Sequence, residues 1–567
     1  MTLDEKIGQM VQVDSNALKD KADVKKFFLG SVLSGGGSDP PDNYPATWKK
    51  FADEFQSQAL QTRLKIPLLY GIDAVHGHNN ILGAVIFPHH IGMGATQDAA
   101  LVERAERVTA EEVMGTGIRW AFAPCIAVAR DARWGRSYES YGSSPDLVAE
   151  LGAAAVRGLQ GESLDKNSVL ACAKHFAGDG GTLHGKDQGD TVCDEPTLRK
   201  MFVAPYDAAI TAGVGSIMVS FNSWNGHKMH GNKHLLTEVL KGELRFQGFL
   251  VSDWAAIDQL GPDYKSDVEQ SINAGLDMVM IPNGPGEKNN YAQFIAHLKV
   301  LVAEGKVSPA RVDDAVRRIL RVKFRMGLFQ NPWTDAALTA KIGSPEHREV
   351  ARECVRESLV LLKNSGRLLP LKKDVKRIAV VGRAADDLGM QCGGWTIDWQ
   401  GKLGNVTPGG TTLLAALKKS VSPETEVTYS ADGKDLKSAE VVIVVVGEKP
   451  YAETQGDRSN LDLSTDDARL IARARASAKR VVTVLYSGRP LVLGTALEQS
   501  DAFIAAWLPG TEGLGVADVL FGDCAPRGKL PRPWPASNGD LCVDHSSSKP
   551  QFAAGFGLTY GYRVSQK

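Results

Sequence analysis

The sequence predicts an α/β protein in which a (β/α)8 barrel is followed by a smaller α/β sandwich domain. Short apolar segments alternate with helical stretches over roughly the first 330 residues, and eight such segments can be counted. Strands buried on both faces of a parallel sheet are nearly continuous apolar runs, and the helices between them cover the faces. A second alternating set follows a segment with two prolines, which indicates a second domain.

The eight barrel strands are expected at the apolar segments, taken in chain order. The first two lie close together, so we expect the barrel to be irregular there. The segments are Met10–Val13, Gly30–Ser34, Pro67–Asp73, Trp120–Ile126, Val169–Phe176, Ser216–Phe221, Phe249–Asp253 and Leu276–Ile281. Helices are expected between most of them, at Ala99–Gly115, Thr197–Ala212 and Asn232–Leu244. Eight strands favour closure into a barrel, a fold of about 250 residues or more.

The second domain is expected to begin with a long helix. We place the barrel domain at residues 1–328, a linker at 329–345 and the sandwich domain at 346–567, with the helix over 346–364. The alternation then resumes as a smaller sheet with intervening helices such as Thr465–Ala478. Its strands are expected at Ile378–Gly382, Val441–Gly447, Val481–Ser487 and Phe503–Trp507.

Composition excludes several classes of partner. Lys and Arg total 65 against 66 Asp and Glu, so a formal charge of −1 offers no attraction to nucleic acid or an anionic membrane. No apolar run reaches the ~18–20 residues needed to span a bilayer. Of the seven cysteines, three in apolar or Gly-rich surroundings are expected to be plain buried thiols: Cys125, Cys172 and Cys392. No signal peptide is visible, although a leader could have been removed before the helix-like start MTLDEKIGQM, so the compartment is not determined.

Polar residues of mixed charge follow the predicted strands at the end where barrel enzymes carry their active sites. Carboxylates and cations hydrogen-bond hydroxyl groups, and indole faces cover the apolar side of a sugar ring, so this mixture suits an uncharged polyhydroxylated ligand. Taken singly, each residue could instead be a helix cap or part of a solvated ion pair. The residues are Asp73, Arg130, Asp131, Arg133, Arg136, Lys174, His175, Asp253 and Trp254.

No metal or cofactor motif is convincing. The histidines of HGH and PHH lack partners at the i, i+4 spacing of a helical zinc site. Gly382-Arg383-Ala384 lacks the further glycines of a dinucleotide fingerprint, and neither a phosphate-binding loop nor a GxSxG elbow occurs. We therefore expect catalysis, if any, to rest on side chains alone, with no cofactor and no metal.

Several stretches together resemble glycoside hydrolase family 3, in its branch of exo-acting β-glucan glucohydrolases and β-glucosidases. They are GIDAVHGHNN, FAPCIAVARDARWGRSYESY, KHFAGDGGT, GFLVSDWAAID, RILRVKFRMGLF, QCGGWTIDWQGK and VGEKPYAETQGDRSNL. The resemblance extends along nearly the whole chain. It implies a barrel followed by a sandwich domain, an active site at their junction, and removal of terminal non-reducing β-D-glucose from β-glucosides and β-gluco-oligosaccharides with retention.

The resemblance also implies residue roles. Asp253, in the SDW motif, matches the nucleophile that forms a covalent glucosyl intermediate, and Glu453, in PYAE, matches the general acid/base. A retaining glycosidase places two such carboxylates about 5–5.5 Å apart. Cations near Asp253 would keep it ionised, whereas Glu453 lies on a loop with few cations before Arg458. The residues implied to bind sugar are Asp73, Arg136, Lys174 and His175 in the −1 subsite, Met218 and Trp254 at its wall, and Trp395 and Trp399 around the next sugar.

Alternatives remain open within and outside this branch. His184 and Asp187 could form the acid/base pair of a β-N-acetylglucosaminidase, and the chain could be a sugar-binding protein without turnover. Glu448, at the end of the strand VVIVVVG, is a second candidate acid. The resemblance implies two departures: many relatives have a tyrosine where Phe221 stands, and plant exo-glucanases have a glutamate where Gln188 stands. Linkage preference, acceptance of xylosides and oligomeric state are not determined, and the family suggests the periplasm or the cell exterior.

Overall fold

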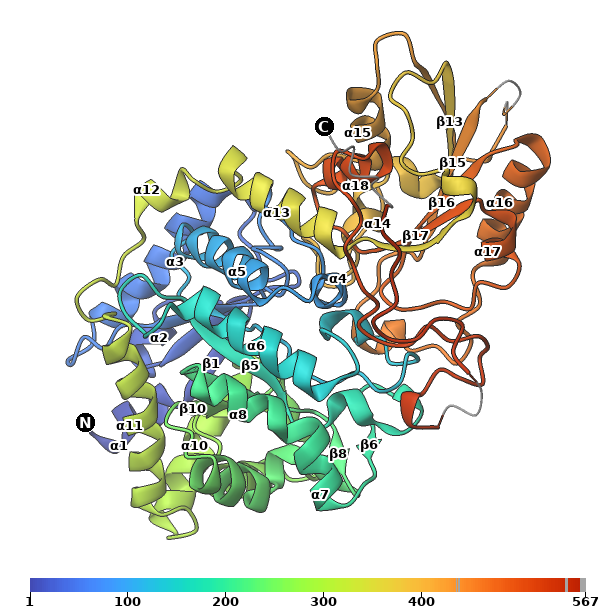
Figure 1. The fold of residues 1–567 in the computed structure, drawn as a ribbon. Helices are drawn as coiled ribbons and strands as arrows, with labels where there is room; N and C mark the ends of the chain where they lie inside the picture. Colours follow the sequence, from blue (N-terminus) through green and yellow to red (C-terminus); the bar gives the residue numbers. More distant parts are fainter. Residues whose placement is uncertain (435, 437–438, 546–548, 561–567) are drawn as a thin grey trace. The chain divides into compact units, whose positions relative to one another are not determined.

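The computed structural model describes residues 1–434, 436, 439–545 and 549–560, and contacts divide the chain into two units (Figure 1). The first comprises Met1–Ala84, Val102–Val128 and Val148–Ile342. The second comprises Val85–Leu101, Ala129–Leu147 and the chain from Gly343 onward. The boundary expected from sequence keeps residues 1–328 together, whereas these contacts group two loop-and-helix segments from that stretch with the later chain.

The first unit is a barrel of eight parallel strands, as the sequence predicted. Their order is β10-β7-β5-β4-β3-β2-β1-β11, and a parallel bridge between Val251 and Met278 brings the two edges together. Every strand is buried along its length, which explains the continuous apolar runs. The strands are β1 Val11–Asp14, β2 Ser31–Ser34, β3 Leu69–Ile72, β4 Trp120–Ala121, β5 Leu170–Phe176, β7 Ser216–Val219, β10 Phe249–Val251 and β11 Val279–Ile281.

Helices connect the barrel strands, and α1 Leu3–Gln9 packs against α10 and α11 (Figure 1). The helix predicted over residues 197–212 contains a π-helical turn at Arg199–Val203. Pro205 lies just after this turn and has no N–H to continue the regular hydrogen-bond ladder, so the wider turn accommodates it. The longer helices are α3 Pro45–Leu60, α5 Ala99–Met114, α6 Pro145–Gln160, α8 Ala204–Thr211, the π-helical η6 His234–Glu243, α9 Tyr264–Ala274, α10 Tyr291–Ala303 and α11 Pro309–Arg325.

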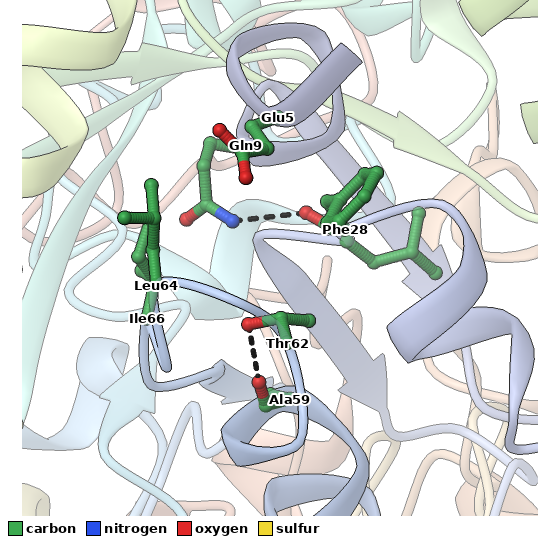
Figure 2. A pocket seen from close by; sticks show the side chains of 8 residues that line it. Glu5, Gln9, Phe28, Ala59, Thr62, Leu64 and Ile66 are labelled. Carbon is green, nitrogen blue, oxygen red and sulfur yellow. Dashed lines mark hydrogen bonds between the residues drawn. The ribbon is translucent and has the colours of Figure 1, made fainter. Parts of the chain in front are cut away.

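A buried lysine holds the amino-terminal ends of three barrel strands. Lys323 on α11 donates to Gln9 Oε1 and to the carbonyl oxygens of Gly30 and Pro67, each at 2.8 Å. These acceptors precede β1, β2 and β3. Gln9 in turn donates to the Phe28 carbonyl beside a cavity of about 10 Å³, room for roughly one water (Figure 2). This end of the barrel is therefore a stabilising face, opposite the end that carries chemistry.

The second unit contains a six-stranded sheet in the order β12-β17-β16-β15-β13-β14. All neighbouring pairs are parallel except β12 and β17, which are antiparallel. The helices α15 Leu413–Ser420, α16 Thr465–Ser477 and α18 Gly513–Phe521 connect or follow its strands. The strands are β12 Val360–Asn364, β13 Arg377–Val381, β14 Glu426–Ser430, β15 Val441–Gly447, β16 Val481–Tyr486 and β17 Ala502–Trp507.

The prediction of one long helix over residues 346–364 was wrong. Helix α13 spans Pro345–Ser358, and the chain then enters β12, which pairs with β17. The apolar run at 359–362 fits the buried face of a helix or a strand, and pairing with β17 decides in favour of the strand. Strand β14 was not predicted because its residues are polar and it lies at the sheet edge. Within the described residues, no helix is both long and apolar enough to cross a bilayer.

Candidate active-site residues

The end of strand β10 presents Asp253, the predicted nucleophile. Asp253 lies two residues beyond the strand and is 9% exposed. Its carboxylate Oδ1 accepts from the Trp254 backbone N–H at 2.7 Å, and its own backbone N–H donates to His230 Nε2 at 3.1 Å. The carboxylate is thus held by one backbone N–H, and the Asp253 backbone itself is held by one buried imidazole.

One basic side chain expected beside Asp253, His175, lies near it in the first unit, whereas Arg136 belongs to the second unit. His175 on β5 places Nε2 3.8 Å from Asp253 Oδ2 and donates through Nδ1 to Asp179 Oδ2 at 2.8 Å. Lys174 pairs with Asp73 beyond β3, with Nζ 3.4 Å from Oδ1. The polar residues from three strand ends therefore interact pairwise, and Asp179 is a member that the sequence did not reveal.

His230 is a second member that sequence reasoning missed. It is 1% exposed, and burial lowers its pKa to about 3, so the ring is neutral. Because Nε2 accepts from Asp253, the proton is on Nδ1, which bonds to the Ser220 backbone. His230 thus links the segment after β7 to the residue after β10. No sequence motif identified His230, because its role depends on a hydrogen bond with Asp253, which lies 23 residues away in the sequence.

The predicted sugar-facing residues of the barrel differ in exposure. Met218 in β7 is buried, whereas Trp254 is 43% exposed and has an indole surface available for stacking. Phe221 is partly exposed, and its ring centroid lies 6.3 Å from that of His230. Gln188 accepts from Gln259 Nε2 at 3.1 Å. The two departures from the family pattern are thus both within the loops at this end of the barrel.

The second unit holds Glu453, the predicted acid/base, together with Arg136. Arg136 Nη1 lies 3.1 Å from Glu453 Oε1. The same guanidinium forms a bidentate ion pair with Glu139, in which each hydrogen bond is 2.9 Å long. The expectation of few cations around Glu453 was therefore wrong, because Arg136 is distant in sequence. The Glu453 side chain is 20% exposed, whereas those of Arg136 and Glu139 are buried.

Glu448, the alternative acid, has a structural role. Its Oε2 accepts from the Tyr451 hydroxyl at 2.9 Å and from the Gly488 N–H at 3.0 Å, and its Oε1 lies 3.1 Å from Arg458 Nη1. Both oxygens are thus occupied inside the second unit. These contacts favour Glu453 over Glu448 as the group that meets substrate.

The two tryptophans of the QCGGWTIDWQGK stretch have different surroundings. Trp395 is only 7% exposed, and its indole N–H donates to Glu139 Oε1 at 3.1 Å. Trp399 is partly exposed. Glu139 thus orients Trp395 as well as Arg136, and sequence reasoning missed it because nothing in the motif distinguishes it from a surface glutamate.

The two members of the alternative acid/base pair differ in exposure: His184 is exposed, whereas Asp187 is buried. The three cysteines expected to be buried thiols, Cys125, Cys172 and Cys392, are indeed buried and free of disulfides.

Comparison with known families matches both halves of the chain. Residues 2–322 match the glycosyl hydrolase family 3 N terminal domain, and residues 359–560 match the glycosyl hydrolase family 3 C-terminal domain. A lysosomal beta glucosidase of Dictyostelium discoideum is 33% identical over 99% of this chain and 75% of its own length. A periplasmic beta-glucosidase of Salmonella typhimurium is 32% identical over 96% of this chain and 74% of its own.

Solved structures agree with this assignment. A mutant exo-1,3/1,4-beta-glucanase from a Pseudoalteromonas species superposes with a TM-score of 0.94 and 42% identity, covering 100% of this chain and 94% of the other. A beta-glucosidase from Listeria innocua, solved in complex with glucose, has a TM-score of 0.85 and 29% identity, covering 99% and 82%. Barrel, sheet domain and strand-end carboxylates together define a glycoside hydrolase. The chain belongs to glycoside hydrolase family 3.

Proposed function

We propose that this chain is an exo-acting β-glucosidase or exo-β-glucanase that removes terminal non-reducing β-D-glucose with retention, using Asp253 as nucleophile and Glu453 as acid/base. The observation that carries the proposal is the surroundings of Asp253. The Asp253 carboxylate accepts from the Trp254 backbone N–H, the Asp253 backbone is held by His230, and His175 lies 3.8 Å from the second carboxylate oxygen, so the group is oriented for attack. The names of the relatives, exo-1,3/1,4-beta-glucanase and beta-glucosidase, support glucosides as substrates.

In the first step, Asp253 attacks the anomeric carbon as the bond to the leaving oxygen breaks. Glu453 gives its proton to that oxygen, and a glucosyl ester on Asp253 remains. In the second step, Glu453 takes a proton from water, the water oxygen attacks the anomeric carbon, and the ester bond to Asp253 breaks. Two inversions give net retention.

The ion pair of Glu453 with Arg136 bears on both steps. A guanidinium beside a carboxylate favours the ionised form, which is the form needed to activate water. The acid step needs the protonated form. Arg136 also donates to both carboxylate oxygens of Glu139, which partly neutralise its positive charge. Its electrostatic attraction for Glu453 is therefore weaker than that of a guanidinium with no other partner. Glu139 thus helps a single carboxyl group to serve as acid and then as base.

Sugar recognition is assigned from the same contacts. Asp73, Lys174 and His175 provide charged hydrogen-bonding groups for hydroxyls of the glucosyl unit, and Trp254 provides an exposed indole face. On the family pattern, Met218 of the first unit is assigned to the wall around the glucosyl unit, and Arg136, Trp395 and Trp399 of the second unit are assigned to sugar binding. Of these two tryptophans, Trp399 is the more exposed and the better placed for stacking.

We extend the proposal to compartment and partners. The periplasmic relative from Salmonella typhimurium supports a periplasmic or extracellular location. The partners are small and neutral, namely β-glucosides and β-gluco-oligosaccharides, and the net charge of −1 gives no reason to expect nucleic acid. We also propose that the chain is divided into a barrel domain, a linker and a sandwich domain at the boundaries expected from the sequence.

The test is hydrolysis of an aryl β-glucoside followed by proton NMR of the first-formed sugar. The proposal expects β-glucose to appear before mutarotation, and activity to fall strongly in Asp253→Asn. First-formed α-glucose would contradict a retaining mechanism. A preference for aryl N-acetyl-β-glucosaminide, unaffected by Glu453→Gln, would favour the alternative enzyme. Binding of glucose without any turnover would favour a sugar-binding protein.

A further inference from the structure

Three buried side chains of types that can bind metals lie close together, and one of them, His175, lies beside the proposed nucleophile. Cys125 follows β4, His175 lies in β5, and Asp179 follows β5. One ligand atom from each lies within 4.8 Å of the other two, and all three residues are buried. Sequence reasoning missed this cluster because the donors come from two strand ends and show no helical spacing.

The donor set fits a borderline-soft divalent cation. Zn²⁺ takes thiolate sulfur, imidazole nitrogen and carboxylate oxygen, at about 2.3 Å for sulfur and about 2.0–2.2 Å for nitrogen and oxygen. Tetrahedral coordination at such lengths separates the donors by about 3.3–3.6 Å. His175 Nδ1 and Asp179 Oδ2 are now 2.8 Å apart across a shared proton, so small side-chain shifts would convert this contact into joint coordination.

Tyr206 supplies an independent observation. It is 1% exposed, and among the described residues its hydroxyl oxygen has no hydrogen-bond partner. Its ring packs against Phe176, the residue after His175, with ring centroids 4.9 Å apart. Most buried hydroxyl groups form a hydrogen bond, so the Tyr206 hydroxyl is expected to have a partner in some state of the protein. Water held as the fourth ligand of a cation in this cluster would supply it.

We propose that Cys125, His175 and Asp179 form a binding site for Zn²⁺ or a similar thiophilic divalent cation, and that its occupancy inhibits the enzyme. On binding, the Cys125 thiol loses its proton, the Nδ1 proton of His175 is displaced, and bonds form from sulfur, nitrogen and the Asp179 carboxylate to the metal. The bound group is then neutral, with two positive charges matched by one thiolate and one carboxylate.

Inhibition follows from the place of His175, and this part rests on the proposed function. Coordination at Nδ1 replaces the hydrogen bond to Asp179 that orients the ring, and the ring must shift to bring the donors to coordination distance. The Nε2 atom of the same ring lies 3.8 Å from Asp253, so this shift changes the geometry around the nucleophile. We expect turnover to fall in proportion to metal occupancy.

The test is titration of the full chain with Cd²⁺, which gives thiolate-to-metal charge-transfer absorption, with stoichiometry from native mass spectrometry. We expect one ion per chain in the wild type and loss of that ion in Cys125→Ala. Cys172→Ala is the matched control, since Cys172 is a buried cysteine of β5 three residues before His175, and it should keep the ion. Asp179→Asn should weaken binding by at least about 10-fold, since even outer-shell changes cost that much.

Absence of a bound ion in the wild type, or an unchanged absorption in Cys125→Ala, overturns the proposal. If Cys125→Ala does not fold, Cys125→Ser keeps the shape of the side chain but replaces the soft sulfur, and the same loss is expected. The readout does not depend on glycosidase activity. A metal site in a chain that cleaves no glucoside would overturn the proposed function alone, and an active enzyme that binds no cation would overturn the metal site alone.

Discussion

Replacing His230 by leucine tests whether the backbone contact to Asp253 matters for turnover. The substitution removes the acceptor for the Asp253 N–H and the donor to the Ser220 backbone. Each buried polar group left without a partner costs about 1–3 kcal/mol, so with two such groups the free energy of unfolding should fall by about 2–6 kcal/mol. A nucleophile displaced by about 1 Å loses about 100-fold in rate. We expect this loss in kcat rather than KM.

The assay is steady-state hydrolysis of an aryl β-glucoside, paired with thermal unfolding. His230→Gln is the rescue variant, because a glutamine amide oxygen can replace Nε2 as acceptor, and it should recover to within about 10-fold of wild type. His78→Leu is the matched control, since His78 is another buried barrel histidine whose pKa burial lowers to about 3. It should lose stability without the same loss in kcat. Wild-type kcat/KM in folded His230→Leu would refute the reasoning.

Three further outcomes are expected. Glu453→Gln should lose turnover most for poor leaving groups, because protonation of the leaving oxygen is lost, and equal losses for good and poor leaving groups would count against the acid role. Glu139→Gln should raise KM, since Arg136 and Trp395 both lose a charged partner, and an unchanged KM would show that Glu139 does not position them. Burial raises the pKa of Glu106 to about 8 from its usual 4.5. The folded chain therefore retains a proton that the unfolded chain releases, so the free energy of unfolding should fall as pH rises from about 4.5 to about 8, by at most about 5 kcal/mol. Urea unfolding across that range should show the slope, and Glu106→Gln should remove it.

The barrel could be predicted from the sequence because each strand is buried on both faces, and a strand buried in this way has an almost continuous run of apolar residues. The segment at 359–362 shows the limit of that signal, since pairing with β17 rather than local pattern makes it a strand. The same limit applies to β14, a polar edge strand.

The site could be predicted where a residue stands at a strand end or within a family motif. Asp253, His175 and Lys174 were found in this way. His230, Asp179 and Glu139 were not, because each acts through a hydrogen bond that only the folded chain creates. The ion pair of Glu453 with Arg136 escaped for the same reason, since more than 300 residues separate the partners.

The most direct test of the central claim is covalent trapping of the nucleophile. The protein is incubated with a 2-deoxy-2-fluoro-β-glucoside bearing a good leaving group, and the adduct is mapped by peptide mass. Fluorine slows both steps and the leaving group rescues only the first, so the glycosyl-enzyme should accumulate. The account predicts a fluoroglucosyl mass on the peptide that contains Asp253. An adduct on another carboxylate, or no adduct on protein that still cleaves aryl β-glucosides, would contradict it.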